Sequence, residues 1–185
     1  MTDSQPAERE ALYSQLENEY GNIVYSQATQ EEQQTQLIRT ERNIKVAQIA
    51  LSALSSAGLV GIFFTQHEWV TALTGLTTFA LLFLNSYSFQ FEIGTKIARH
   101  RKAGDQLWLL VRKYQSLLVD FPDLSTEEVR KRRDELIDET ATVYGEAERT
   151  DDRNFNKAKK RLQNEGLKEF TREELNKLLP EELRR

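Results

Sequence analysis

Few side chains in this sequence have types and spacings that could support chemistry. Cysteine is absent, and the two histidines, His67 and His100, are far apart in the chain. A nucleophilic triad or a metal site needs several such groups to converge. A glycine-rich phosphate loop is also missing, because Gly58 and Gly61 lie inside an apolar run. The sequence therefore predicts no enzyme, no metal site and no cofactor.

The most informative polar groups are amides and hydroxyls set within two apolar segments. Polar side chains at membrane depth face protein or water rather than lipid, which leaves two interpretations open. In one, the hydroxyls bond to preceding carbonyls of their own helix, and the amides Gln48 and Asn85 join helices. In the other, these groups line a wet path. The candidate pore-lining residues are Gln48, Ser52, Thr74, Thr78 and Asn85.

The two apolar segments are long enough to cross a membrane. Residues 46–64 and 70–91 contain no charged side chain, although 29% of the whole chain is charged. As a helix at about 1.5 Å per residue, the first segment reaches about 28 Å, which matches a hydrocarbon core of about 30 Å. The connection at residues 65–69 is so short that the two helices must be antiparallel neighbours. We therefore predict an all-α membrane protein with a two-span transmembrane hairpin at residues 46–91.

A soluble alternative places the same hairpin at the centre of a helical bundle, where apolar helices also occur. A chain of 185 residues rarely supplies enough protein to cover two such helices on every side. The sequence therefore favours the membrane.

Lysine and arginine precede the first apolar segment and follow the second, whereas the connection at residues 65–69 has none. By the positive-inside rule both termini are expected in the cytoplasm, with His67 outside and Trp69 at the outer interface. The mostly polar residues 1–45 precede the first span, so no cleavable signal peptide is predicted. The absence of cysteine fits a bacterial cytoplasmic face, and residues 96–102 are expected to contact anionic lipid head groups. The membrane-flanking basic residues are Arg39, Arg42, Lys45, Lys96, Arg99, Arg101 and Lys102.

A stripe of small residues on the first span indicates helix packing. Ala53, Ala57 and Gly61 recur every four residues, and such stripes let helix backbones approach closely in lipid. We therefore predict a homo-oligomer. A pore would in any case require several copies arranged in a ring, because two helices cannot surround a column of water.

The remaining residues, 1–45 and 92–185, are expected to form N-terminal and C-terminal cytoplasmic helical regions. Apolar residues spaced by three and four predict amphipathic helices, and Ser125 to Glu128 reads as a capping box. Pro122 is expected to end a helix that continues the second span. The expected cytoplasmic helices cover roughly residues 12–23, 107–121, 126–143, 153–164 and 171–180.

Two polar features of these regions bear on possible partners. The stretch Gln27 to Gln36 is almost wholly polar, as expected for a solvated helix face or for a contact with a partner. Basic clusters at 130–133 and 157–161 are interleaved with acidic residues, and the net charge of the chain is -4. A solvated, ion-paired helix surface explains them, so no nucleic acid is expected as a partner.

Several short segments, in order and spacing around the hairpin, resemble the SLATT family. The name stands for SMODS- and SLOG-associating two-transmembrane effectors. The chain departs from its relatives at Arg149, where they carry proline before the threonine at 150. The resembling segments are VYSQ at 24–27, AQIALSAL at 47–54, LLFLN at 81–85, LW at 107–108, YQSLL at 114–118, RDEL at 133–136, FT at 170–171 and LPEELR at 179–184.

The resemblance implies a membrane effector of bacterial anti-phage defence. Such a protein would assemble, open or disrupt the inner membrane, and halt the infected cell. It implies a trigger through a nucleotide second messenger, or through a partner sensor or synthase, and it supplies no catalytic residues. The alternative is a non-conducting scaffold that holds a partner defence protein at the membrane.

Overall fold

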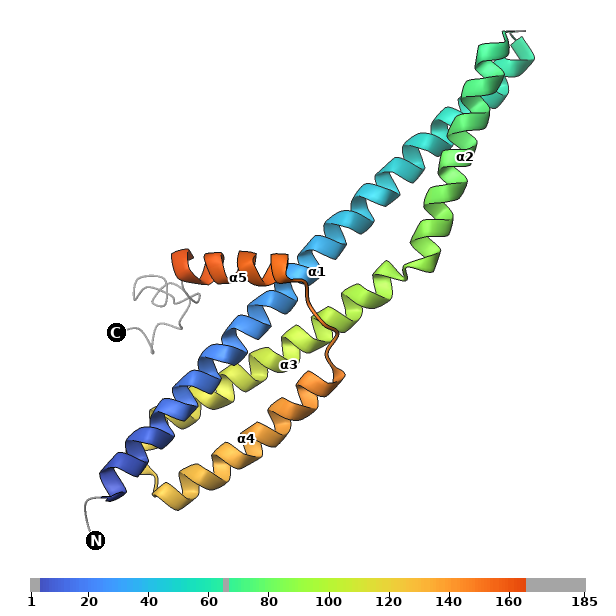
Figure 1. The fold of residues 1–185 in the computed structure, drawn as a ribbon. Helices are drawn as coiled ribbons and strands as arrows, with labels where there is room; N and C mark the ends of the chain where they lie inside the picture. Colours follow the sequence, from blue (N-terminus) through green and yellow to red (C-terminus); the bar gives the residue numbers. More distant parts are fainter. Residues whose placement is uncertain (1–3, 65–66, 166–185) are drawn as a thin grey trace, which may run out of the picture.

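The structure is a computed structural model that describes residues 4–64 and 67–165, and every element in those ranges is helical. Strands do not occur in that part of the chain, so the predicted all-α class is confirmed there. The elements are α1 (Ser4–Phe64), α2 (Glu68–Gln90), α3 (Ile93–Asp120), the short 3-10 helix η1 (Phe121–Asp123), α4 (Thr126–Glu146) and α5 (Asp152–Glu165) (Figure 1). The helix expected near 171–180 lies outside the described residues.

Helix α1 is longer than the sequence pattern suggested. Its 61 residues join the expected N-terminal helix, the polar stretch 27–36 and the first apolar segment into one rod of about 90 Å. The polar stretch continues the helix because glutamine, glutamate and alanine are good helix formers and proline and glycine are absent from it. The boundary predicted between residues 45 and 46 therefore falls inside a single unbroken helix.

The expectation that the second span continues unbroken into the cytoplasm is wrong. Helix α2 ends at Gln90, and Glu92 adopts the left-handed conformation, with φ 44° and ψ 43°. The chain changes direction there before α3 begins at Ile93 (Figure 1). A left-handed residue other than glycine is uncommon and costs free energy, so this bend is a defined feature of the fold.

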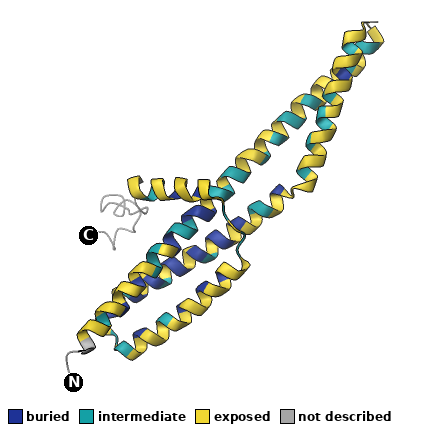
Figure 2. Cartoon of the chain, in the orientation of Figure 1, coloured by how far each residue is buried: buried dark blue, intermediate teal, exposed yellow. Residues whose placement is uncertain are grey.

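The core of the molecule lies in the helical body away from the apolar hairpin, where α1, α3 and α4 pack together. Tyr114 and Leu16 are fully buried there, as is Val129, and Figure 2 shows the buried positions on the facing sides of α1 and α3. The predicted capping box is confirmed: the Ser125 hydroxyl accepts from the backbone of Glu128, whose carboxylate accepts from the backbone of Ser125. The core residues are Leu12, Leu16, Ile23, Val24, Leu107, Leu110, Val111, Tyr114, Leu117, Phe121, Val129, Leu136 and Val143.

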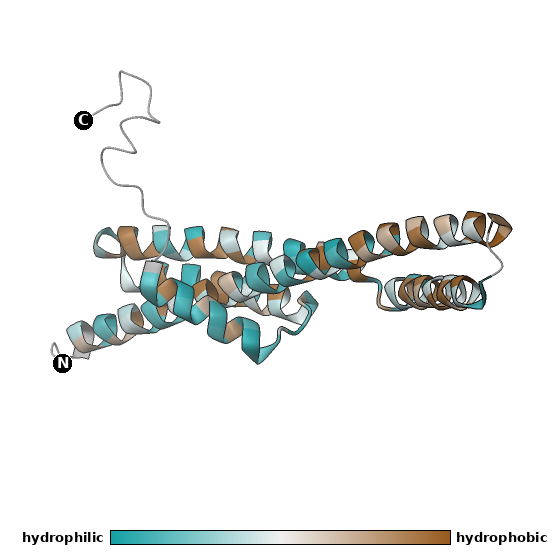
Figure 3. Ribbon diagram, turned by 90° about the horizontal axis from the view of Figure 1, so that it is seen from above, coloured by the Kyte–Doolittle hydropathy of each residue, from teal (hydrophilic) through white to brown (hydrophobic). Residues whose placement is uncertain are grey.

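The apolar half of α1 and the whole of α2 extend beyond this body as an antiparallel pair, coloured mainly hydrophobic at the far end of the molecule in Figure 3. Both helices are long and apolar enough to cross a membrane. Only 6% of the most apolar 18-residue window in each helix is buried, whereas the core helix of a soluble protein would be mostly covered. Phe63 and Phe89 are 88% and 85% exposed. Within the part of the chain that the structure describes, these helices therefore have little protein cover apart from each other.

Candidate functional site

A line of hydroxyl groups lies between the two apolar helices. Thr74 Oγ1 donates to the Val70 carbonyl oxygen at 2.8 Å, and Thr78 Oγ1 donates to the Thr74 carbonyl oxygen at 2.8 Å. Across the gap, Ser55 Oγ of α1 donates to Thr77 Oγ1 of α2 at 3.1 Å. Ser55 and Thr74 are both buried between the two helices. These hydroxyls are therefore satisfied within one hairpin, as the first of the two sequence interpretations expects.

An amide pair joins the same helices nearer the helical body. Gln48 Nε2 of α1 donates to Asn85 Oδ1 of α2 at 2.9 Å. Together with the hydroxyls it forms a polar seam, which we define as Gln48, Ser55, Thr74, Thr77, Thr78 and Asn85. The edge of the seam is open: Thr78, Asn85 and the neighbouring Ser52 are exposed in the single chain.

The two apolar helices approach each other closely at Gly58, a glycine that the sequence analysis did not select for packing. A Cβ atom at Gly58 would overlap Oγ1 of Thr74, whereas one at Gly61 would stand 3.7 Å from Val70 Cγ1, an ordinary contact. Ala53 and Ala57, the other members of the predicted stripe, are exposed in the single chain. Gly58 is not part of the stripe formed by Ala53, Ala57 and Gly61. Its contact is with Thr74 of α2, and a spacing pattern within α1 cannot reveal a contact with another helix.

Most of the membrane-flanking basic residues lie near acidic side chains of the body. Lys45 pairs with Glu41 at 2.8 Å on α1, and Lys96 lies 5.8 Å from the centre of the Phe91 ring. Further ion pairs join Arg99 to Glu148, Arg101 to Asp105, and Lys102 to Glu146, at 3.1, 3.9 and 2.8 Å. Their side chains are 60%, 72% and 66% exposed. Surface pairs of this kind add little stability.

The polar stretch 27–36 meets the chain's own C-terminal region. Gln33 Oε1 accepts hydrogen bonds from Asn154 Nδ2 at 2.6 Å and from the backbone N–H of Asp151 at 3.3 Å. Directly before Gln33 on α1, Glu31 and Glu32 pair with Arg161 of α5 at 3.2 and 2.8 Å. The linker between α4 and α5, together with α5 itself, therefore covers this polar face of α1.

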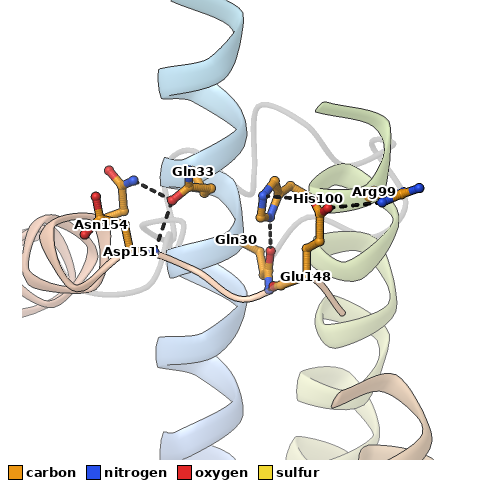
Figure 4. Close-up of polar contacts among 7 residues, drawn as sticks. All are labelled: Gln30, Gln33, Arg99, His100, Glu148, Asp151 and Asn154. Carbon is orange, nitrogen blue, oxygen red and sulfur yellow. Dashed lines mark hydrogen bonds and ion pairs between the residues drawn. The ribbon is translucent and has the colours of Figure 1, made fainter. Parts of the chain in front are cut away.

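The densest set of polar contacts, drawn in Figure 4, is the linker junction. His100 Nδ1 lies 2.6 Å from Gln30 Oε1, and Gln30 Nε2 donates to the Glu148 carbonyl oxygen at 3.1 Å. The Glu148 carboxylate pairs with Arg99 through Oε1 and faces His100 Nε2 through Oε2 at 3.6 Å. We define the linker junction as Gln30, Gln33, Arg99, His100, Glu148, Asp151 and Asn154.

Burial sets the protonation of the junction histidine. His100 is 3% exposed, and removal from water lowers its pKa below the ordinary 6.5. Glu148 opposes this shift and Lys96 adds to it. His100 is therefore neutral at neutral pH. The sequence offered no signal for this role, because Gln30 and Glu148 lie far from His100 along the chain.

The fold and these sites define an all-helical protein with two candidate membrane-spanning helices, a polar seam between them and a helical body that the chain ties together through the linker junction. Among the described residues, no group of three or more metal-binding side chains occurs. The sequence profile of the SMODS and SLOG-associating 2TM effector domain family 4 matches residues 12–174. The chain therefore belongs to this SLATT family, which confirms the resemblance drawn from short segments.

The family is a two-transmembrane effector domain associated with defence systems, and not a known catalytic family. Its name implies association with SMODS and SLOG proteins, a sensor or synthase kind of partner. No curated protein and no solved structure matches the chain.

Proposed function

We propose that this protein is a membrane effector of a bacterial anti-phage defence system, and that copies of it assemble in the inner membrane to form a conducting path when triggered. Both termini lie in the cytoplasm, and the hairpin crosses the lipid. Activation dissipates the membrane potential and arrests growth of the infected cell.

One observation carries the proposal: two apolar helices without protein cover enclose a polar seam whose edge is open. Burying the exposed apolar surface in lipid is strongly favourable, whereas an exposed amide such as Asn85 needs protein or water at membrane depth. A ring of hairpins resolves this conflict, because it turns the seam edges of all copies toward one axis. The exposed Ser52, Thr78 and Asn85 then meet water there, with Gln48 and Thr74 behind them.

The trigger acts on the cytoplasmic body, which offers the surface for a nucleotide second messenger or for a partner sensor or synthase. A cleft of about 330 Å³ lies between α1, the linker and α5, lined by Ser26, Thr29, Gln30, Tyr144, Ala147, Glu148, Arg149, Thr150 and Phe155. Its volume falls in the range of small-molecule sites, about 300–1,000 Å³.

The test compares membrane potential in infected cells that express the wild type or the triple variant T74V/T78V/N85L. The variant keeps side-chain volume close to the original and removes the hydroxyls and the amide that line the path. We expect it to express and assemble like the wild type, without depolarisation. The matched control S56A/S86A changes exposed hydroxyls away from the seam and should depolarise like the wild type.

The bonds inside the seam also favour a second candidate, a non-conducting scaffold, because Gln48 and Asn85 already satisfy each other. A scaffold would leave the potential unchanged even in infected cells with the wild type. A triple variant that conducts like the wild type would instead overturn the assignment of the lining residues.

Assembly itself is tested at the exposed small residues. Replacing Ala57, which is exposed in the single chain, with leucine should separate neighbouring copies, at about 1–3 kcal/mol for each overpacked contact. We expect a smaller particle in native mass spectrometry from detergent. An unchanged particle size would show that the stripe faces lipid.

A further inference from the structure

Hydrogen bonds to α1 hold the walls of the cleft in the helical body. Tyr144 Oη, near the end of α4, donates to Ser26 Oγ of α1 at 2.8 Å. In the linker, the Glu148 carbonyl oxygen accepts from Gln30 at 3.1 Å. The contacts of Gln33 described above fix the start of α5 in the same way. The cleft of about 330 Å³ between these walls therefore belongs to the folded body, as a binding site that is formed in advance does.

Two aromatic side chains line this cleft, one from each side of the linker. Tyr144 belongs to α4 and Phe155 to α5, and they are 44% and 43% exposed. Phe155 is the only aromatic residue of α5, and its ring lies 6.3 Å from the ring of Tyr25 on α1. Aromatic rings that remain partly in water within a concave surface favour a planar aromatic ligand, because stacking removes apolar surface of both from water.

The charge that the cleft leaves uncompensated is positive. Arg149 lines the cleft, is exposed, and forms no ion pair with another residue that the structure describes. Glu148 supplies the carboxylate of the lining, but it pairs with Arg99 of α3 at 3.1 Å, and its second oxygen is buried beside His100. An anion in the cleft therefore meets a guanidinium without a partner among the described residues. The planar fork of arginine matches a phosphate group.

The remaining lining is small and rich in hydrogen-bonding groups. The hydroxyls of Ser26 and Thr150 and the amide of Gln30 lie in the same cleft as the two rings. Its volume is near the lower end of the range for small-molecule sites, about 300–1,000 Å³. The space therefore suits one base with its phosphate rather than a whole dinucleotide.

We propose that this cleft binds one nucleotide unit, with the base against Tyr144 and Phe155 and the phosphate on Arg149. A free mononucleotide and one unit of a cyclic dinucleotide share this chemistry, and the experiment below separates the two sources. The role of this binding as the trigger rests on the function proposed above, whereas the binding itself does not.

Calorimetric titration of the full-length protein in lipid nanodiscs tests the site. The probes are the four ribonucleoside monophosphates, the corresponding nucleosides, inorganic phosphate, and cyclic di-AMP and cyclic di-GMP. We expect at least one nucleotide to bind about tenfold or more tightly than both its nucleoside and inorganic phosphate, because the rings and Arg149 act on the same molecule. The tighter binder among the mononucleotides and the cyclic dinucleotides identifies the source of the unit.

Three variants assign the parts of the site. Arg149→Gln should weaken nucleotide binding by about tenfold or more and leave nucleoside binding unchanged. Phe155→Leu should weaken both, because it removes a stacking surface and keeps an apolar side chain. The matched control Arg153→Gln removes an exposed charge of α5 that does not line the cleft, and it should bind nucleotides like the wild type. Thermal unfolding of each variant checks that the body is intact.

Three results would overturn the site: no nucleotide binding to the wild type at about 1 mM, inorganic phosphate that binds as tightly as every nucleotide, or unchanged nucleotide binding in Arg149→Gln. Current is recorded separately in vesicles that contain the same protein. Nucleotide binding without a current would leave the site standing and count against the conducting path. Depolarisation in infected cells by a protein that binds no nucleotide would overturn the site and leave the path standing.

Discussion

Gly58 of α1 lies directly against Thr74 of α2, so closely that a Cβ at Gly58 would overlap the Thr74 hydroxyl. This contact sets the separation of the two apolar helices, because the Thr74 hydroxyl is held in place by the Val70 carbonyl at 2.8 Å. At this point the two helices therefore pack through one glycine and one threonine on opposite helices.

Replacing Gly58 with alanine should force the helices apart and destabilise the hairpin by about 1–3 kcal/mol, the usual cost of overpacking. Thermal unfolding in detergent measures the loss. Gly75→Ala is the matched control, because a Cβ there meets nothing within 4 Å. Adding Thr74→Ala to Gly58→Ala should recover part of the stability; no recovery would mean that Thr74 is not the obstacle.

The amide pair of the seam should show energetic coupling. Replacing either Gln48 or Asn85 with leucine leaves the other amide without its partner at membrane depth, while the double variant removes both groups. We expect the double variant to cost less than the two single variants together, by about 0.6–1.7 kcal/mol, as for other interhelical bonds in membranes. A double-mutant cycle on unfolding in detergent measures this, and strict additivity would rule out the bond.

The topology of the hairpin is tested by labelling, since the natural chain has no cysteine. A cysteine at His67 should react with an impermeant thiol reagent in intact cells, because the loop carries no lysine or arginine. Cysteines at Ala7 and Arg149 should react only after the inner membrane is opened. Labelling of either of these two in intact cells would contradict a cytoplasmic location for both ends.

The cap of α4 should contribute to stability in a pH-dependent way. The Ser125 hydroxyl and backbone N–H donate to Glu128 at 2.6 and 3.0 Å and lower its pKa from 4.5. A lowered carboxyl pKa contributes stability above about 4.5 that is lost as pH falls through the folded value. Ser125→Ala should cost about 0.5–2 kcal/mol at neutral pH and less in acid.

Chemical unfolding at pH of about 7 and about 3, on either side of the ordinary glutamate range, compares Ser125→Ala with the wild type. Ser116→Ala, an exposed serine on α3, is the control and should change stability little at either pH. If Ser125→Ala lowers the free energy of unfolding equally at the two pH values, the Glu128 carboxylate does not contribute to the cap.

Sequence was sufficient wherever the cause of structure is local. The apolar segments are fixed by composition, because a run without charge is long enough to cross a bilayer whatever surrounds it. The capping box needs only Ser125 and Glu128, three residues apart, and it forms as expected. The helical spacing of Val129, Leu136 and Val143 likewise identified the buried face of α4.

Local patterns misjudged continuity along the chain. The polar stretch 27–36 has no apolar period, so the sequence did not reveal that one helix, α1, runs from the N-terminal region through it into the first apolar segment. The opposite error occurred at Glu92, where nothing in the sequence marks the left-handed turn. Such a conformation is held by the packing of the helices on either side, which a local pattern does not contain.

Only the tertiary structure decided which polar groups meet. His100 and Gln30 are 70 residues apart, and Gln30 reaches Glu148 across 118 residues. The contact between Gly58 and Thr74 could not be predicted from residue types, since the two residues belong to different helices. The sequence determined that two apolar helices and a charged helical body exist. Chain folding over long separations decided how they pack, because burial and hydrogen bonding depend on neighbours in space and not along the chain.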